Sequence, residues 1–291
     1  MHTSHKIWRV RRGIIVSLTD TQGQTAQGEI APIPWFGSED INQAIQFCQQ
    51  QGNTISLETI QSIPDSLPAC QFGFESAFLT INQQLPSIKE DELNYCHLLP
   101  TGKKALEETY SSVTENETSP TFKWKIGVDE IATEIALLKQ LIVQLPQNAR
   151  LRLDANGGLT VDEAKRLLEF TETQSIIEFI EQPLPPSQFS EMIELGKNYN
   201  TSLALDESVA NIKQLKNCYE RGWRDVFVIK PLIAGFPSLL RQFCQQYSLD
   251  VVFSSVFETF VGRQAALKLA WELGNRSRAI GFGTKQWFQD S

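Results

Sequence analysis

The sequence predicts an α/β fold, a modified (β/α) barrel of the (β/α)7β type, preceded by a smaller α+β unit. Five apolar runs each end in a charged residue, and the gaps between these residues are 29, 27, 25 and 24 positions: Lys125, Asp154, Glu181, Asp206 and Lys230. A strand, a loop and a helix together need roughly 20–30 residues. The spacing therefore predicts one charged side chain at the C-terminal end of each of five successive strands, where such barrels build their active sites.

The first hundred residues predict the α+β unit. Residues 7–18 are rich in β-forming side chains, and the turn-forming stretch 19–25 follows, so we expect a hairpin or meander. Ser38 is expected to cap a helix that runs through Cys48 and ends near Gly52. A second short helix is expected over residues 74–82.

From residue 95 onward, strand patterns alternate with helical ones, which is typical of a parallel sheet. The polar stretch 111–120 is expected to be a surface loop, so the first crossover, 101–121, is weak, and no full eighth helix fits after Gly281. We expect a first domain of residues 1–96 plus 282–291 and a barrel over 97–281. Strands are expected at 95–100, 122–126, 151–154, 176–181, 202–206, 225–230, 249–254 and 279–282, and helices at 131–145, 160–171, 187–198, 211–220, 236–247 and 259–273.

Composition excludes several classes of protein. The net charge of −8, without a basic stripe, argues against a nucleic-acid surface. No apolar run has the length of a membrane span, and the N-terminus lacks the pattern of a signal peptide. The five cysteines include no Cys-x-x-Cys pair, which indicates reduced thiols and a cytoplasmic protein. Nothing in the sequence fixes an oligomeric state.

Three carboxylates are the candidate metal ligands. Asp154, Glu181 and Asp206 each take the last inward position of a strand by period-two counting, so they are expected to converge at the barrel mouth. Each one alone could equally be a turn residue or a solvated strand end. Together they would repel one another unless a cation lay between them, and all-oxygen ligation favours Mg²⁺ or Mn²⁺ over Zn²⁺.

Three lysines are the candidate catalytic residues. Lys125 lies on the second barrel strand, and Lys123 has the same parity. A partly desolvated lysine beside another cation has a lowered pKa, so Lys125 is expected to serve as a base near neutral pH. Lys230, across the barrel, is expected to act as a second acid or base or as a fixed positive charge. The three histidines, His2, His5 and His97, close none of the later strands, which excludes a lysine–histidine pair and a histidine-ligated metal.

The remaining polar residues near strand ends are weaker candidates. Ser254, Ser255 and Gly281 follow the last two strands and could offer hydroxyl and N–H groups to a substrate carboxylate, although a plain loop role is as plausible for them. Arg152 shares the parity of Asp154, and its partner does not follow from the sequence.

In this order and spacing, Lys-x-Lys, Asp-Ala-Asn, Glu-Gln-Pro, Asp-Glu-Ser and Lys-Pro resemble the enolase superfamily, muconate-lactonising branch. Gly28-Glu-Ile-Ala-Pro and Phe72-Gly-Phe-Glu-Ser-Ala resemble the capping domain of that branch. Within the branch, the short chain, the Ser254-Ser255 pair and the compact ending are most similar to the o-succinylbenzoate synthase family.

The resemblance implies a reaction and a set of roles. Asp154, Glu181 and Asp206 would ligate Mg²⁺, and Lys125 would remove a proton α to a carboxylate and then protonate the departing hydroxyl. Lys230 would stabilise the enediolate, and Lys123 would tune Lys125 and contact the substrate carboxylate. Asn156 would orient a metal-bound oxygen or a lysine. The implied reaction is dehydration of 2-succinyl-6-hydroxy-2,4-cyclohexadiene-1-carboxylate to o-succinylbenzoate, a step toward menaquinone or phylloquinone. The alternative, an N-succinylamino acid racemase or dipeptide epimerase on the same scaffold, would use the two lysines as paired bases.

Overall fold

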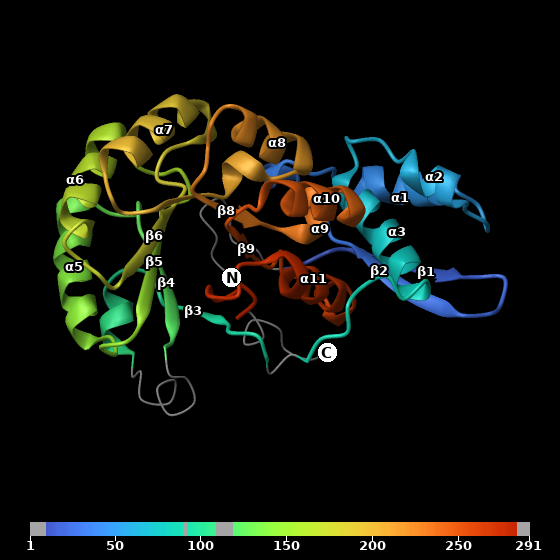
Figure 1. Cartoon of the computed structure of the whole chain (residues 1–291), viewed down its shortest axis with the longest axis horizontal. Coiled ribbons are helices and arrows are strands. Elements are labelled where there is room, and N and C mark those ends of the chain that lie inside the picture. The colour runs from blue at the N-terminus through green and yellow to red at the C-terminus, as the bar shows by residue number, and fades with distance from the viewer. Residues whose placement is uncertain (1–9, 90–91, 109–118, 284–291) are drawn as a thin grey trace.

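The computed structural model describes residues 10–89, 92–108 and 119–283, which form a parallel barrel sheet with an α+β unit beside it (Figure 1). The α+β unit begins with an antiparallel hairpin of β1 (Ile14–Thr19) and β2 (Thr25–Ile30). Three helices complete the unit: α1 (Ile41–Gln50), α2 (Leu57–Gln61) and α3 (Pro68–Ile81). The predicted hairpin is confirmed, and residues 7–9 of its first expected strand lie outside the described residues.

Two predictions about these helices were wrong in detail. Asp40, not Ser38, caps α1, because the Asp40 carboxylate and the Gln43 side chain form a reciprocal capping box. Ser38 instead accepts a hydrogen bond from the Ile33 N–H at 2.6 Å within the preceding turn. The helix expected at residues 74–82 is α3, which begins earlier, at Pro68. A proline is favoured in the first turn of a helix, and the buried Glu39 carboxylate accepts hydrogen bonds from the next two N–H groups, at 3.0 and 2.7 Å.

Seven parallel strands form the barrel sheet in the order of the sequence. They are β3 (Cys96–Leu98), β4 (Thr121–Lys125), β5 (Arg150–Asp154), β6 (Ile177–Glu181), β7 (Leu203–Leu205), β8 (Val226–Ile229) and β9 (Val251–Phe253). The eighth predicted strand, 279–282, is reduced to two isolated bridges, one from Ile280 to Tyr95 and one from Gly281 to Ser254. These bridges still join the two edges of the sheet, since backbone hydrogen bonds run from this segment to both neighbours.

The helices that follow the strands agree with the predicted positions within one or two residues. They are α5 (Ile131–Gln144), α6 (Val161–Thr171), α7 (Phe189–Asn198), α8 (Ile212–Glu220), α10 (Pro237–Tyr247) and α11 (Phe260–Leu273). The weak first crossover holds only the 3-10 segment η3 (Gly102–Glu107), and residues 109–118 of the expected loop lie outside the described part. The short helix α9 (Pro231–Ala234), directly after β8, was not predicted.

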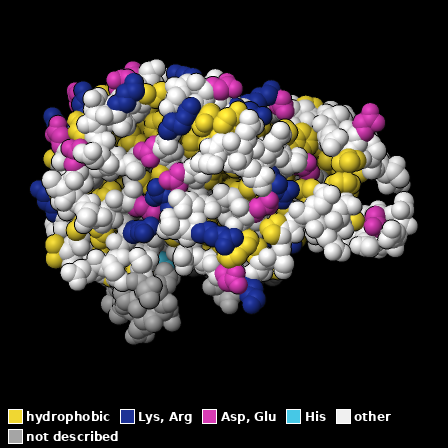
Figure 2. Space-filling view, in the orientation of Figure 1, with side chains coloured by type: hydrophobic (Ala, Val, Ile, Leu, Met, Phe, Trp, Pro, Cys, Tyr) yellow, Lys and Arg dark blue, Asp and Glu magenta, His cyan; other side chains and the backbone are white. Residues whose placement is uncertain are grey.

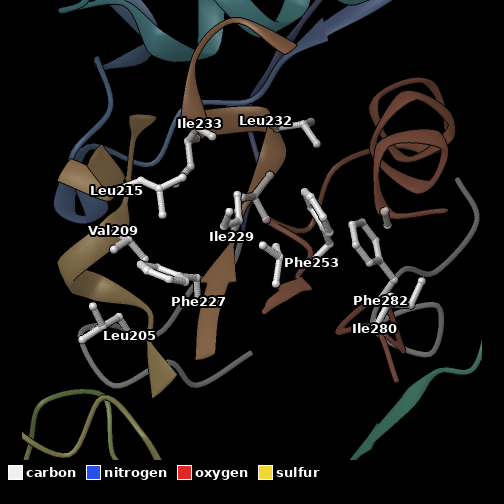
Figure 3. Close-up of a cluster of buried hydrophobic side chains, with 14 of the residues drawn as sticks. Leu205, Val209, Leu215, Phe227, Ile229, Leu232, Ile233, Phe253, Ile280 and Phe282 are labelled. Atoms are coloured by element: carbon white, nitrogen blue, oxygen red, sulfur yellow. The ribbon is translucent and has the colours of Figure 1, made fainter. Parts of the chain in front are cut away.

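The main hydrophobic core lies between the sheet and its helices. Figure 3 shows part of it, in which Leu205, Phe227, Ile229 and Phe253 from β7, β8 and β9 belong to the same buried cluster as Leu215 of α8. Residues of β6, β7, β8 and β9 form a second, smaller buried cluster: Phe179, Ala204, Val226, Val228 and Val252. Because successive strand residues point to opposite faces, this second cluster fills the barrel interior. The inward faces of β6, β7, β8 and β9 are thereby identified.

Buried carboxylates join the α+β unit to the barrel. Glu29 at the end of β2 accepts hydrogen bonds from the Thr259 N–H and hydroxyl and from the Gly262 N–H, all at the start of α11. Glu75 of α3 does the same for the N–H and hydroxyl of Ser238 in the first turn of α10, at 2.9 and 2.7 Å. The two parts are therefore held in one orientation over the barrel mouth.

Candidate active site

Strand register brings the predicted charged residues to one edge of the sheet. Lys125 pairs with Asp154, and Asp154 pairs with Glu181, in the parallel ladders of β4, β5 and β6. Asp206 directly follows β7, and Lys230 directly follows β8. Since the strands are parallel, all five residues lie at their carboxyl ends, which is the geometry that the sequence predicted.

The three residues on β6, β7 and β8 continue the inward rows of their strands. Glu181 lies two positions after Phe179, Asp206 two after Ala204, and Lys230 two after Val228, and these three apolar residues belong to the barrel-interior cluster. Side chains two residues apart point to the same face. Glu181 and Asp206 are both buried, at 2% and 3% exposure, so they close the interior rather than extend into solvent.

Lys123 bridges two of the three acids. Its ammonium Nζ lies 2.7 Å from Asp154 Oδ2 and 2.7 Å from Glu181 Oε1. Burial would lower the pKa of Lys123, but the charges of Asp154, Glu181 and Asp206 outweigh burial and raise that pKa well above its usual range. Lys123 is thus held charged between carboxylates and is unsuited to be a base itself.

Lys230 is paired with the third acid and covered by an aromatic ring. Its ammonium forms an ion pair with Asp206 Oδ1. On another side it lies 4.0 Å from the centroid of the Phe36 ring, which comes from the 3-10 segment η1 (Pro34–Phe36) of the α+β unit. Only 12% of the Lys230 side chain is exposed.

Lys125 has a different environment from both. Its side chain makes no hydrogen bond or ion pair with the described residues and is partly exposed at the end of β4. Partial burial lowers the pKa of Lys125, opposed by the charges of Asp154 and Glu207 and assisted by that of Lys123. The direction agrees with the one expected from the sequence, although burial rather than the neighbouring cation is its main cause. An unpaired amine of lowered pKa is the form that a general base requires.

The donor set fits a hard divalent cation. Burial, with the repulsion of Asp154, raises the pKa of Glu181 to about 7, and burial also raises the pKa of Asp206 to about 6. The site thus concentrates negative charge that two lysines only partly offset. As the side chains stand, no group of three or more His, Cys, Asp or Glu among the described residues is arranged to hold an ion, because the acids turn toward the lysine ammoniums. The carboxylate oxygens already form ion pairs with the lysine ammonium groups, and a set of three carboxylates suits Mg²⁺.

Two further residues lie beside the acids: Asn156, which was a candidate from the sequence, and Gln182, which was missed. Asn156 donates from Nδ2 to Glu207 Oε1 at 3.0 Å, so it links the loops after β5 and β7. Gln182, wholly buried and left-handed at φ 39°, accepts hydrogen bonds at its Oε1 from the N–H groups of Asp206 and Ser208. Its amide nitrogen donates to the Ser208 hydroxyl and the Leu184 carbonyl. Gln182 therefore fixes the backbone that carries Asp206; its one signal in the sequence was its place directly after Glu181.

The other predicted substrate-binding groups are largely engaged inside the protein. The Ser255 hydroxyl donates to Glu258 Oε2 at 2.8 Å and accepts from the Phe257 N–H, and the Gly281 N–H donates to the Phe253 carbonyl at 2.7 Å. Ser254 Oγ makes only a long contact of 3.4 Å to the Gly281 carbonyl, so of these three it is the best placed for a substrate. Their roles stay predictions.

Arg152 belongs to the barrel interior rather than to the mouth. It pairs with Glu178 at 2.6 Å and lies over the Phe179 ring. Arg278 reaches the same Glu178 at 3.0 Å and pairs with Asp250 at 2.7 Å. This network ties β5 and β6 to the segment that closes the barrel.

The face of the molecule in Figure 2 shows basic side chains interspersed with acidic ones, without a continuous basic stripe.

Comparisons with known proteins place the chain among enzymes of one type. Residues 105–290 match the family described as enolase C-terminal domain-like, and residues 3–81 match the MenC N-terminal domain. The o-succinylbenzoate synthase of Thermosynechococcus vestitus is 39% identical over 98% of this chain and 88% of its own length. That of Aliivibrio fischeri is 29% identical over 90% of this chain and 79% of its own length.

Solved structures agree with this placement. A crystal structure of o-succinylbenzoate synthase from Thermosynechococcus elongatus, with Mg in its active site, has a TM-score of 0.90 and 37% identity over 100% of this chain and 91% of that one. The N-succinyl Arg/Lys racemase of Bacillus cereus has a TM-score of 0.80 at 16% identity, over 96% of this chain and 82% of that one. The second likeness concerns the fold alone.

Proposed function

The chain belongs to the o-succinylbenzoate synthase family of the enolase superfamily, and on this premise we propose how its residues carry out the dehydration. The reaction removes water from 2-succinyl-6-hydroxy-2,4-cyclohexadiene-1-carboxylate and yields o-succinylbenzoate, a precursor of menaquinone or phylloquinone. The observation that carries the proposal is the set of three acids and two differently placed lysines at one edge of the barrel. The enzyme is accordingly a hydro-lyase.

Asp154, Glu181 and Asp206 are the residues that would hold Mg²⁺. When bound, the ion offsets the negative charge that develops on the substrate carboxylate as its α-proton is removed. Lys123 sets the orientation of two of these acids through its contacts of 2.7 Å to Asp154 and to Glu181. Gln182 sets the third by fixing the N–H of Asp206.

Lys125 carries the proton in both halves of the reaction. Its neutral amine takes the α-proton, and the electron pair of that C–H bond moves into an enediolate. The resulting ammonium then gives the same proton to the hydroxyl at the neighbouring ring carbon. The C–O bond breaks, water leaves, and the electron pair of the enediolate forms the double bond that completes the aromatic ring. One group suffices because the proton is returned to the same substrate molecule.

The unequal lysines favour the synthase over a racemase. A racemase needs two bases of similar character on opposite faces of the substrate carbon. Lys230 is instead ion-paired with Asp206 and covered by Phe36, whereas Lys125 has no partner among the described residues. Of the two roles that the sequence left open for Lys230, these contacts support the fixed positive charge beside the enediolate.

We propose further that residues 1–96 with 282–291 form the capping domain and that 97–281 form the barrel. The partner of the site is a small carboxylate substrate, and neither nucleic acid nor membrane is part of its function. Within the described residues, no helix combines the length and the apolar composition needed to cross a bilayer. We place the enzyme in the cytoplasm, on the basis of its cysteine usage.

A dehydration assay tests the proposal. With Mg²⁺ present, the aromatic absorbance of o-succinylbenzoate should appear; EDTA should abolish the signal, and excess Mg²⁺ should restore it. N-succinylamino acids and dipeptides in D₂O serve as the competing substrates. Exchange of their α-proton without any dehydration of the cyclohexadiene would overturn the synthase proposal in favour of the racemase or epimerase.

A further inference from the structure

Lys230 touches a side chain from outside the barrel, and neither the metal site nor the proton transfer explains that contact. The ring of Phe36 lies with its centroid 4.0 Å from Lys230 Nζ, while Asp206 occupies another side of the same ammonium. An aromatic ring presents a negative face to a cation and attracts it without neutralising its charge. The contact therefore differs in kind from the ion pair.

The turn that carries Phe36 is rigid and lies against the loop of Asp206. Gly37 adopts a left-handed conformation, φ 112°, and its N–H donates to the Pro34 carbonyl at 3.2 Å. Ser38 Oγ accepts from the Ile33 N–H at 2.6 Å. A Cβ at Gly37 would lie 3.4 Å from the Cβ of Ala210, which closes the segment that Asp206 begins. These hydrogen bonds and the close approach to Ala210 therefore hold the Phe36 ring of the α+β unit at the barrel mouth.

We propose that Phe36 is a positioning residue for Lys230: its ring gives the ammonium a second, uncharged partner and holds it at the edge of the substrate site. Without the ring, the attractions on Lys230 would come from carboxylates, chiefly Asp206 and also Glu181 and Glu207, and the ammonium would turn fully into the ion pair. Its positive charge would then stabilise the Asp206 carboxylate rather than the enediolate. The inference rests on the charge-stabilising role proposed above for Lys230.

Two substitutions at this position separate a ring from mere bulk. Phe36→Leu keeps apolar volume but removes the negative face, whereas Phe36→Tyr keeps the face. We expect Phe36→Leu to lower kcat about tenfold with a smaller change in KM, and Phe36→Tyr to stay within about twofold of the unaltered enzyme. Melting temperatures should be alike in all three, since the side chain is only partly buried.

A double-mutant cycle with Lys230→Met tests whether the ring acts through the lysine. In that background, Phe36→Leu should cause no further loss of kcat. An equal additional loss would show that the ring acts on the substrate directly and would overturn the inference. Equal losses in Phe36→Leu and Phe36→Tyr, together with lower melting temperatures, would also overturn it, because they would indicate a packing role.

A spectroscopic readout is independent of activity. With ¹³C-labelled lysine, the ε-methylene signal of Lys230, assigned by its loss in Lys230→Met, should be shifted upfield by the ring current and should return in Phe36→Leu. No change in that signal would overturn the contact itself. If the shift is present but Lys230→Met retains full dehydration, the contact stands and the role proposed for Lys230 fails, so the two failures are distinguishable.

Discussion

At the scale of single residues, three lysines within one barrel mouth differ because their surroundings differ. Lys123 lies between two carboxylates, Lys230 between a carboxylate and a ring, and Lys125 beside no partner in the described chain. A charged partner stabilises the ammonium, whereas burial without one favours the neutral amine. One residue type thereby supplies a structural cation, a fixed catalytic charge and a base.

The pH dependence of kcat/KM should report the base. Because burial lowers the pKa of Lys125, the neutral amine becomes populated as pH rises through a value below that of an ordinary lysine, about 10.4. With Mg²⁺ saturating, we expect kcat/KM to increase from neutral pH toward alkaline pH and to level off below that ordinary value. A rate that is flat or falls over this range would contradict the assignment of a lysine base.

At the scale of elements, the packing of β2 on α3 depends on backbone approaching backbone. A Cβ at Gly28 would lie 1.9 Å from the Gly73 carbonyl oxygen, and a Cβ at Gly73 would lie 2.5 Å from Ile30 Cγ1. Rotating a side chain cannot relieve the contact at Gly28, because the neighbouring atom there belongs to the main chain. The turn of Phe36 follows β2 in the chain, and Glu39, just after that turn, accepts hydrogen bonds from the first turn of α3, so the spacing of the two elements bears on the site.

Gly28→Ala should therefore destabilise the protein by about 1–3 kcal/mol, as overpacking does. Gly196→Ala is the matched control: Gly196 lies on the exposed face of α7, and its Cβ would meet nothing nearer than 4.0 Å. Because alanine is the better helix former, the control should gain about 0.5–1 kcal/mol. Denaturant unfolding gives both values, and equal midpoints for Gly28→Ala and the unaltered protein would refute the close approach.

Elements whose signals are local could be predicted from the sequence. The strand ends at Lys125, Asp154 and Glu181 follow from period-two alternation and from the repeated length of a βα unit. The cap of α1 could not be decided in this way, because Ser38 and Asp40 are both good capping residues and the choice depends on the N–H of Ile33.

The parts of the site that depend on distant partners were not predictable. Phe36 meets Lys230, and Gln182 meets Ser208, only once the chain has folded. No periodicity or motif in the sequence links such residues. The eighth strand was overpredicted for a related reason: residues 279–282 are apolar enough for a strand, but only Ile280 and Gly281 form bridges to their neighbours.

At the scale of the whole molecule, buried glutamates hold the α+β unit on the barrel. Glu29 alone accepts from two N–H groups and one hydroxyl at the start of α11, at distances of 2.6 to 3.0 Å. A carboxylate at a helix N-terminus also interacts favourably with the helix dipole. Since Phe36 comes from the α+β unit, this junction sets the position of one wall of the site.

Glu29→Gln should weaken the junction, because the amide turns donor groups toward backbone donors. We expect a loss of about 1–3 kcal/mol in unfolding free energy, measured by calorimetry. Glu58→Gln is the control, since the Glu58 carboxylate also lies at the start of a helix, α2, but is exposed; it should change stability by less than about 0.5 kcal/mol. Equal effects of the two substitutions would argue against the junction.

The most direct test of the account is the turnover of Lys125→Ala, measured beside its melting temperature, with the exposed Lys165→Ala as control. Lys125 makes no ion pair in the described chain, and burial disfavours its charged form, so its removal should cost no stability. We predict that dehydration is abolished while the melting temperature is unchanged or slightly higher, and that Lys165→Ala behaves as the unaltered enzyme. A folded Lys125→Ala protein that keeps more than a few per cent of the turnover would contradict the assignment of Lys125 as the residue that moves the proton.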